Sequence, residues 1–148
     1  MSKVYNLNMK QLEKLDKVVD NLEDLTLDVM KESVKDLIKD ANTPTNAGGR
    51  MRVDTGFLRS SGTGAINEIP RGETEGRRRS SGETGVIYDY KGSSALQAIL
   101  QKLKIGDTLY YGWTARYAEI RELYDGFLEA AVQKWNEIVD NNVRRLKK

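Results

Sequence analysis

The sequence predicts an α+β fold, in which a small antiparallel sheet packs against a long N-terminal helix and a C-terminal helix. Two stretches, one near each end of the chain, have apolar residues at helical spacing. The β-rich runs between them lack the regular strand–helix alternation of a doubly wound sheet. We expect residues 1–148 to form one domain. It divides into a long helix at 8–41, a glycine- and arginine-rich loop and arm at 43–85, and strands, a short helix and a C-terminal helix at 86–148.

The first predicted helix runs from Asn8 to Ala41. Asn8 is a suitable N-cap, and Gln11 three residues later completes a capping box. The helix should end before Pro44, because a proline disfavours helical backbone in the residue that precedes it. At about 1.5 Å per residue the helix would be about 50 Å long, so we expect part of its apolar stripe to pack against another subunit. The stripe consists of Leu12, Leu15, Val19, Leu22, Val29 and Leu37, widened by Leu25, Met30, Val34 and Ile38.

The middle of the chain is rich in glycine, serine, threonine and arginine. Ala65–Ile69 is predicted as a short strand, and Val86–Tyr90 as a second, β-rich strand. Pro70–Gly82 lies between them and has too few apolar residues to order itself by packing. It is therefore predicted to be a long, flexible hairpin arm.

Three further elements complete the predicted fold. Ser93–Lys104 is a short amphipathic helix, and Thr108–Trp113 is a strand. A single C-terminal helix is expected to begin with Asp125 as its N-cap and to continue to about Arg145. Its predicted apolar stripe contains Leu128, Ala131, Val132, Trp135, Ile138, Val139 and Val143.

The composition excludes several kinds of chemistry. The chain has no cysteine, so disulfides, thiolate nucleophiles and cysteine metal sites are excluded. It has no histidine, which is the most common general base at neutral pH and a frequent metal ligand. There is no phosphate-binding loop or dinucleotide-binding motif, and no apolar run approaches the roughly 20 residues of a membrane span. We expect no catalytic residues, no cofactor, no metal and no membrane partner. The net charge of +2 indicates neither a nucleic-acid coat nor a membrane-surface protein.

The segment VDTGFLRSS at 53–61 predicts a sharp turn. Asp54 and Thr55 can accept hydrogen bonds from nearby amides, and Gly56 can take a positive φ. A strand should follow the turn, with Phe57 and Leu58 in the core and Arg59, Ser60 and Ser61 facing outward. Aspartic proteases also carry a DTG triplet, but their chemistry needs two aspartates that share a proton. The apolar residues expected around such a triplet are missing here.

Two other groups of residues are candidates for binding. Aromatic residues gather within 106–122. We favour the interpretation that they lie in the core and at a protein interface. The alternative is that they stack on the bases of a single-stranded nucleic acid. They are Tyr110, Tyr111, Trp113 and Tyr117. Arginines on the predicted arm would contact phosphates or an acidic partner, or would remain solvated. These arginines are Arg71, Arg77, Arg78 and Arg79.

Three segments in order, VDTGFLRSS, GDTLYYGWTARYAEIRE and GFLEAAVQKWNEIVD, resemble the tail-completion (neck) proteins of long-tailed siphophages, the gene-product-ten type of the lambdoid phages. The resemblance covers about Val53–Asp140. Members of that family carry a DTG-x-L-R-x-S turn, a glycine and aspartate before a strand, a YA-x-x-x-E segment and a closing helix. The matching residues are Asp54, Thr55, Gly56, Leu58, Arg59, Ser61, Gly106, Asp107, Gly112, Trp113, Tyr117, Ala118, Glu122, Phe127, Ala130, Ala131 and Trp135.

The resemblance implies a non-enzymatic structural protein of the virion that helps join the tail to the filled head. The implied partners are other copies of the chain in a ring, with a hexamer as one form, together with the tail terminator and head-connector proteins. Contact with DNA passing through the channel is also implied. Its location would be the neck or tail of the virion, and the host cytoplasm during assembly. The chain departs from the family pattern at Leu123–Asp125, which separate Glu122 from the next glycine.

Two alternatives stay open. One is a nucleic-acid-binding module that uses Arg71, Arg77–Arg79 and the aromatic cluster. The other is a small host regulator or toxin with a helical partner protein.

Overall fold

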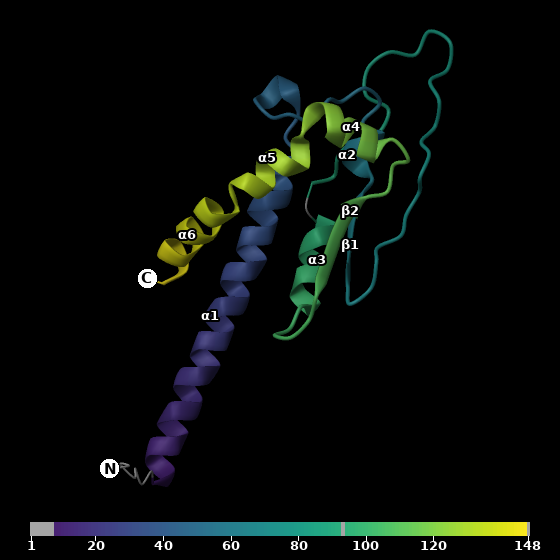
Figure 1. The fold of residues 1–148 in the computed structure, drawn as a ribbon. Helices are drawn as coiled ribbons and strands as arrows, with labels where there is room; N and C mark the ends of the chain where they lie inside the picture. The colour runs from purple at the N-terminus through teal and green to yellow at the C-terminus, as the bar shows by residue number, and fades with distance from the viewer. Residues whose placement is uncertain (1–7, 93, 148) are drawn as a thin grey trace.

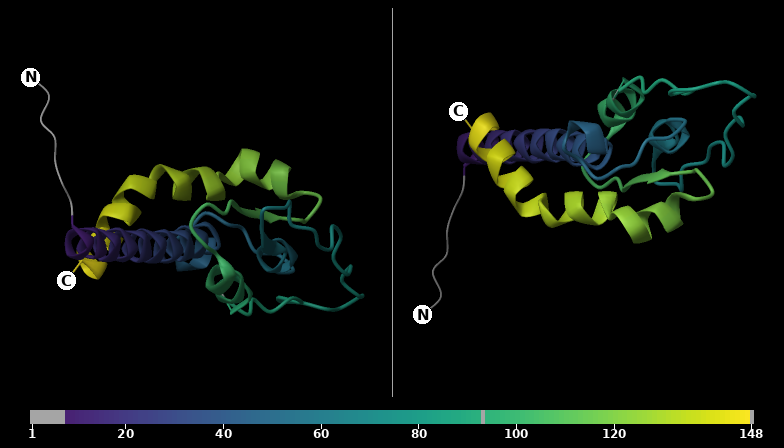
Figure 2. Two further views of the ribbon diagram at one scale, coloured as in Figure 1. Left: turned by 90° about the horizontal axis from the view of Figure 1, so that it is seen from below. Right: turned by 90° about the horizontal axis from the view of Figure 1, so that it is seen from above.

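The computed structural model describes residues 8–92 and 94–147 and has the α+β architecture that the sequence predicts. A long N-terminal helix packs on the C-terminal helix and projects beyond the rest of the molecule (Figure 1). A two-stranded sheet lies between α3 on one side and the row α4, α5 and α6 on the other (Figure 2). The elements are α1 Met9–Ala41, a 3₁₀ turn Thr45–Ala47, α2 Phe57–Ser60, β1 Gly62–Ile66, α3 Ser94–Lys102, β2 Leu109–Trp113, α4 Ala118–Asp125, α5 Phe127–Gln133 and α6 Trp135–Leu146.

Helix α1 begins and ends where the sequence predicts. The Asn8 side chain accepts a hydrogen bond from the Gln11 amide at 3.0 Å, and the Gln11 side chain accepts one from the Asn8 amide at 2.9 Å. The helix ends at Ala41, with Asn42 as its C-cap. Every residue of α1 from Met9 to Asp24 is exposed, and we call this part the α1 stem. Only the second half of α1 packs on α3, α5 and α6.

The body of the molecule has two apolar clusters on either side of the sheet. Strands β1 and β2 are antiparallel, with Gly62 opposite Trp113 and Ile66 opposite Leu109. Helix α3 packs on β1, and its cluster contains Ile38, Leu96, Leu100 and Leu103. The second cluster joins the end of α1 to α2 and α5 and contains Ala41, Met51, Phe57, Leu58, Ala115, Phe127 and Ala131.

The contact between α1 and α6 is polar at its centre. The buried Asn142 side chain donates hydrogen bonds to Ser33 Oγ at 3.2 Å and to Asp36 at 3.0 Å. Arg145 donates to Asn142 Oδ1 and to Glu32, at 2.8 Å and 3.3 Å. These hydrogen bonds satisfy the buried amide and fix the position of α6 along α1.

The prediction of one continuous C-terminal helix is wrong, because the chain bends twice in this region. Gly126 has a φ of +63° and donates its amide to the Glu122 carbonyl, which ends α4. Asp125 is therefore the last residue of α4 and not the N-cap of the following helix. A second break at Lys134 separates α5 from α6. The predicted stripe loses its register at these breaks, so that Val132 and Val143 are exposed and Asn142 is buried.

The predicted strand at Val86–Tyr90 is also wrong. The amides of Ile87 and Tyr88 both donate to the single carbonyl of Thr55, each at 2.8 Å. A strand would instead distribute its amides along a partner strand. The segment is irregular because it packs against the turn at Thr55, and β1 pairs with β2 instead.

Pro70–Gly82 contains no helix or strand and forms the long loop seen in Figure 1. Because no strand follows it, the predicted hairpin geometry is wrong. The loop is attached to the body at several points: Thr114 Oγ1 donates to the Glu73 carbonyl at 2.6 Å, and the Arg116 amide donates to the Thr74 carbonyl at 2.7 Å.

Smaller differences concern the ends of elements. The strand predicted at Ala65–Ile69 starts earlier, as β1, and the residues after the DTG turn form helix α2 before it. Ser61 is buried instead of facing outward, because its hydroxyl donates to the Leu58 carbonyl and accepts from the Ala115 amide. Helix α3 confirms the short amphipathic helix, although Ser93 lies outside the described residues.

Candidate functional site

Asn42, the C-cap of α1, connects two of the residues that the sequence singles out, Arg59 and Trp113, with Tyr90. Its side-chain oxygen accepts from the Trp113 indole at 2.9 Å, and its side-chain nitrogen donates to the Tyr90 hydroxyl at 3.4 Å. Its carbonyl accepts from Arg59 Nε at 2.9 Å, while the Arg59 guanidinium lies 4.0 Å from the centre of the Tyr90 ring. We call these four residues the Asn42 network. Arg59, predicted to face outward, instead joins α2 to the end of α1.

The DTG turn holds the segment that follows the arm. Thr55 Oγ1 accepts from the Phe57 amide at 3.3 Å, which confirms a side-chain-stabilised turn. Gly56 has a φ of +87°, and a Cβ atom there would collide with the Tyr88 carbonyl. A glycine is therefore required both by its backbone conformation and by the close approach of the other segment. Asp54 is exposed and pairs with Arg79 of the arm at 2.7 Å.

Gly106 and Asp107 close the loop between α3 and β2. Gly106 takes a φ of +94°. The Asp107 carboxylate accepts from the Asn67 side chain at 3.1 Å and from the Lys104 amide at 2.9 Å. These hydrogen bonds, the Asn67 one foremost, lower the pKa of Asp107 below its usual range. Asn67 accepts in turn from the Thr108 amide, so the pair fixes one end of the sheet.

The aromatic residues of β2 point alternately inward and outward. Tyr111 and Trp113 are half-buried and make an edge-to-face pair at 5.4 Å between ring centres, and Trp113 makes another with Phe127 at 5.1 Å. Burial raises the pKa of Tyr111 to about 12. Tyr110 is exposed on the other face. The prediction that alternate aromatics enter the core is confirmed.

The YA-x-x-x-E residues connect α4 to α5. Tyr117 packs against Phe57, with 6.4 Å between ring centres, and burial raises its pKa. Ala118 is the first residue of α4 and lies against the core. The two oxygens of Glu122 accept from the amides of Leu128 and Glu129, both at 2.8 Å. Glu122 therefore caps the first turn of α5, a role that typically contributes about 1 kcal/mol.

The four arm arginines do not form one basic patch. Arg77 pairs with both oxygens of Glu83, which lowers the pKa of Glu83, and its amide donates to the Tyr88 hydroxyl. Arg79 pairs with Asp54. Arg71 and Arg78 are exposed and make no ion pair with any described residue. Arg79 therefore attaches the loop to the DTG turn, whereas the Arg77 side chain is paired within the loop's own end.

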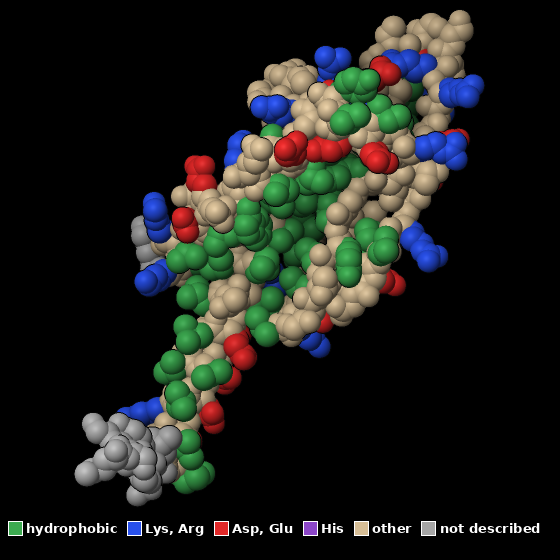
Figure 3. Space-filling view, viewed as in Figure 1, with side chains coloured by type: hydrophobic (Ala, Val, Ile, Leu, Met, Phe, Trp, Pro, Cys, Tyr) green, Lys and Arg blue, Asp and Glu red, His purple; other side chains and the backbone are tan. Residues whose placement is uncertain are grey.

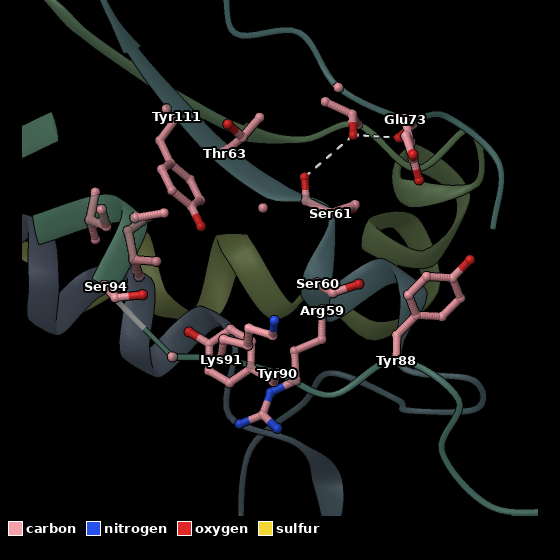
Figure 4. Close-up of a pocket in the computed structure, with 18 of the residues that line it drawn as sticks. Arg59, Ser60, Ser61, Thr63, Glu73, Tyr88, Tyr90, Lys91, Ser94 and Tyr111 are labelled. Atoms are coloured by element: carbon pink, nitrogen blue, oxygen red, sulfur yellow. Dashed lines mark hydrogen bonds between the residues drawn. The ribbon is translucent and has the colours of Figure 1, made fainter. Parts of the chain in front are cut away.

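A pocket of about 540 Å³ lies between β1 and the Tyr88–Gly92 segment. Arg59 and Ser60 from α2, Thr63 from β1 and Tyr111 from β2 surround it (Figure 4). Its volume is that of a small-ligand site. Residues Met51 and Leu58, which form the adjacent core, are fully covered and do not open into it.

Several polar groups of this pocket have partners in the chain. Ser60 Oγ donates to the Phe57 carbonyl, Thr114 bridges the Ser61 and Glu73 carbonyls, and Arg59 belongs to the Asn42 network. No group of three acidic, histidine or cysteine residues that could hold a metal occurs in the described part of the chain. Among the described residues that line the pocket, no hydrogen bond joins a nucleophile to a base.

Exposed apolar side chains line the α1 stem, cover the middle of the body and gather again near α4 (Figure 3). On the α1 stem, Leu15 and Leu22 are 52% and 58% exposed, in a line with other apolar residues. On α4, Ile120, Leu123 and Tyr124 form a group that we call the α4 patch, in which Leu123 and Tyr124 are 82% and 77% exposed. The stem and α4 lie at opposite ends of the elongated molecule (Figure 1). Exposed apolar groups of this kind typically mark interaction surfaces.

Some important residues carry no clear signal in the sequence. Asn42 is recognisable only as a helix stop, because its three partners lie 17 to 71 residues away. The α4 patch includes Leu123 and Tyr124, the residues at which the chain departs from the neck-protein pattern. That departure is a signal for the patch, although it does not reveal that the side chains are exposed.

Comparison with protein-family models, with curated proteins and with solved structures finds no match for this chain in any of the three. No helix in the described ranges has the length and apolar character needed to cross a bilayer.

Proposed function

We propose that this protein is a structural subunit of the neck, or tail-completion layer, of a tailed phage, and that it helps join tail to head through protein–protein contacts. The observation that carries the proposal is the pair of exposed apolar surfaces at opposite ends of an elongated molecule. A subunit placed between head and tail needs separate surfaces for its neighbours on either side. The α1 stem and the α4 patch meet that requirement.

The positions of the neck-protein motif residues support the same proposal. Gly56, Arg59, Trp113 and Glu122 make turns, caps and internal hydrogen bonds, and all are used to hold the body together. Motif residues with these roles are expected of a structural protein, which acts by presenting surfaces of fixed shape to its partners. Under this proposal its partners are copies of itself in a ring, the tail terminator and the head connector.

Joining of heads and tails tests the proposal directly. Tails of the parent phage made without this chain should fail to join filled heads, and adding the purified chain should restore joined particles, counted by electron microscopy. A variant with Leu123→Gln and Tyr124→Gln should restore fewer particles, because it removes the apolar character of the α4 patch while keeping the helix. Glu119→Gln, on the same helix, is the matched control and should restore joining fully.

Normal joining by tails that lack the chain would overturn the proposal. Equal restoration by the α4 variant and its control would exclude the α4 patch as a contact surface.

A nucleic-acid-binding module is less well supported, since Arg77 and Arg79 pair with acidic residues of the same chain. Only Arg71 and Arg78 of the arm remain for phosphates among the described residues. If both bound DNA, the logarithm of affinity would fall with the logarithm of salt concentration with a slope of about −2.

A further inference from the structure

The apolar stripe of the α1 stem continues the face of α1 that α6 covers. Leu12, Leu15, Val19 and Leu22 are separated by steps of three and four residues, and the same steps lead through Thr26 and Val29 to Ser33. Ser33 is fully buried and contacts Asn142 of α6. Helix α6 ends at Leu146, beside Glu32, so it covers the upper part of this face only. The stem therefore exposes a face that elsewhere in the same helix is packed by another helix.

The spacing of the stripe fits packing by another α-helix. Alternating steps of three and four residues place apolar side chains along one seam, as in pairs of long helices. The exposed fractions along the seam are 39% for Leu12, 52% for Leu15, 44% for Val19 and 58% for Leu22. Figure 3 shows apolar side chains along the stem up to the body.

The charges beside the stripe favour a parallel over an antiparallel helix of the same kind. Asp16 and Glu23 directly follow Leu15 and Leu22, so both lie along one edge of the stripe. The other edge carries the uncharged Gln11 and Val18. In an antiparallel pair of stems like edges meet, which brings the acidic residues of the two copies together. In a parallel pair the acidic edge of one stem meets the uncharged edge of the other.

The size of the stripe indicates weak association. At about 1.5 Å per residue the stem is about 24 Å long, on a helix about 10 Å across. This footprint is well below the roughly 800 Å² that each partner contributes to a standard interface. A pair of stems should therefore separate on dilution and associate when copies are concentrated, as they are in a ring.

We propose that the α1 stem is a self-association surface, on which the stem of a second copy packs in parallel through Leu12, Leu15, Val19 and Leu22. The inference rests on the proposed function in one respect: the neck function supplies the ring. In that ring neighbouring copies have the same orientation, so their stems would meet in parallel.

Sedimentation of the full chain tests the surface. The average mass of the wild-type protein should rise as its concentration is raised from micromolar towards millimolar. Leu15→Gln with Leu22→Gln should weaken association at least about tenfold, because two buried leucines become polar. Lys14→Gln with Asn21→Gln has the same spacing on another face of the stem and should associate like wild type. Circular dichroism should show the same helix content in all three proteins.

A wild-type chain that stays monomeric throughout this range, or equal association of the two variants, would overturn the inference. The L15Q/L22Q chain also distinguishes failure of the stem contact from failure of the proposed neck function. If this variant joins heads to tails normally, the stem contact is overturned and the neck function stands. If tails join heads without any chain, the neck function fails whatever the stems do.

Disulfide trapping tests the orientation, and the chain has no native cysteine to interfere. In a parallel pair Leu12 meets Leu12 of the other copy, within the roughly 7 Å between Cα atoms that a disulfide needs. Leu12→Cys should therefore form a disulfide-linked dimer on oxidation, and Lys17→Cys, on another face, should form much less. Efficient linkage only in a mixture of the Leu12→Cys and Leu22→Cys chains would show antiparallel packing and overturn the parallel arrangement.

Discussion

The Asn42 network and the α1 stem use the same helix in opposite ways. At the end of α1, Asn42 is buried and bonded to Arg59, Tyr90 and Trp113, from three other parts of the chain. At the start of α1 every residue of the stem is exposed. The two regions have similar apolar periodicity, so periodicity alone does not tell whether a stripe is buried within the chain. The difference teaches that the network stabilises the fold, whereas the stem is free to act between molecules.

The largest expected contrast concerns removal of an apolar side chain. Phe127 is 3% exposed and contacts Trp113, so Phe127→Ala should lower the free energy of unfolding by about 3–5 kcal/mol. Leu15→Ala in the stem should change it by less than about 0.5 kcal/mol in dilute protein. Urea unfolding followed by circular dichroism measures both. A large loss for Leu15→Ala would mean that the stem packs within its own chain.

The two motif glycines Gly56 and Gly112 sharpen the comparison within the body. Gly56→Ala should cost about 1–3 kcal/mol from backbone strain, and displacement of the Tyr88 carbonyl adds to this. No atom lies within 4 Å of a Cβ built at Gly112, so Gly112→Ala should be nearly neutral. The same unfolding experiment distinguishes them. Equal effects would show that the Thr55 turn is not held against the segment at Tyr88.

Asn42→Ala should have a smaller effect than Phe127→Ala but should still be measurable. It leaves the Trp113 indole N–H without its acceptor, at a cost of about 1–3 kcal/mol. Asn21→Ala in the stem is the matched control and should be neutral or slightly stabilising, because alanine favours helix. Thermal unfolding and tryptophan fluorescence report on both changes. An unchanged fluorescence spectrum in the Asn42 variant would argue against the indole contact.

The smallest expected effect is a loss of stability at alkaline pH. Burial raises the pKa of Tyr111 to about 12, above the value of about 10 in an unfolded chain. This contribution is complete below pH 10 and is lost as the pH rises towards 12, because the unfolded state releases its proton first. Denaturant unfolding at successive pH values should show the loss, and Tyr111→Phe should reduce it. If wild type and Tyr111→Phe lost the same stability at alkaline pH, the loss would come from titration of groups other than Tyr111.

The elements that local chemistry specifies are the ones that the sequence predicts well. The Asn8–Gln11 capping box and the stop before Pro44 fix both ends of α1, since every interaction involved lies within a few residues. The turn at Thr55 and the alternation of exposed Tyr110 with half-buried Tyr111 were predictable for the same reason. Val86–Tyr90 was not, because its β-rich composition competes with a distant carbonyl that takes two of its amides.

Of the candidate binding surfaces, too, the sequence predicted some and missed others. The sequence predicted a stripe on α1 longer than the body could cover, and the stem confirms that part of the stripe is uncovered. It did not predict the α4 patch, because the predicted C-terminal helix began only at Asp125 and left Ile120, Leu123 and Tyr124 outside any helix. The arm arginines were predicted as one group, yet Arg77 and Arg79 are bound to acids of the same chain.

By itself the sequence determined the α+β class, the bounds of α1, the DTG turn and the absence of cysteine and histidine chemistry, because these depend on composition and on neighbours along the chain. Only the tertiary structure decided that Asn42 joins three distant segments, that Glu122 and Gly126 divide the C-terminal region, and which apolar residues remain exposed. Those outcomes depend on contacts between residues far apart in sequence, whose free energies no local pattern contains.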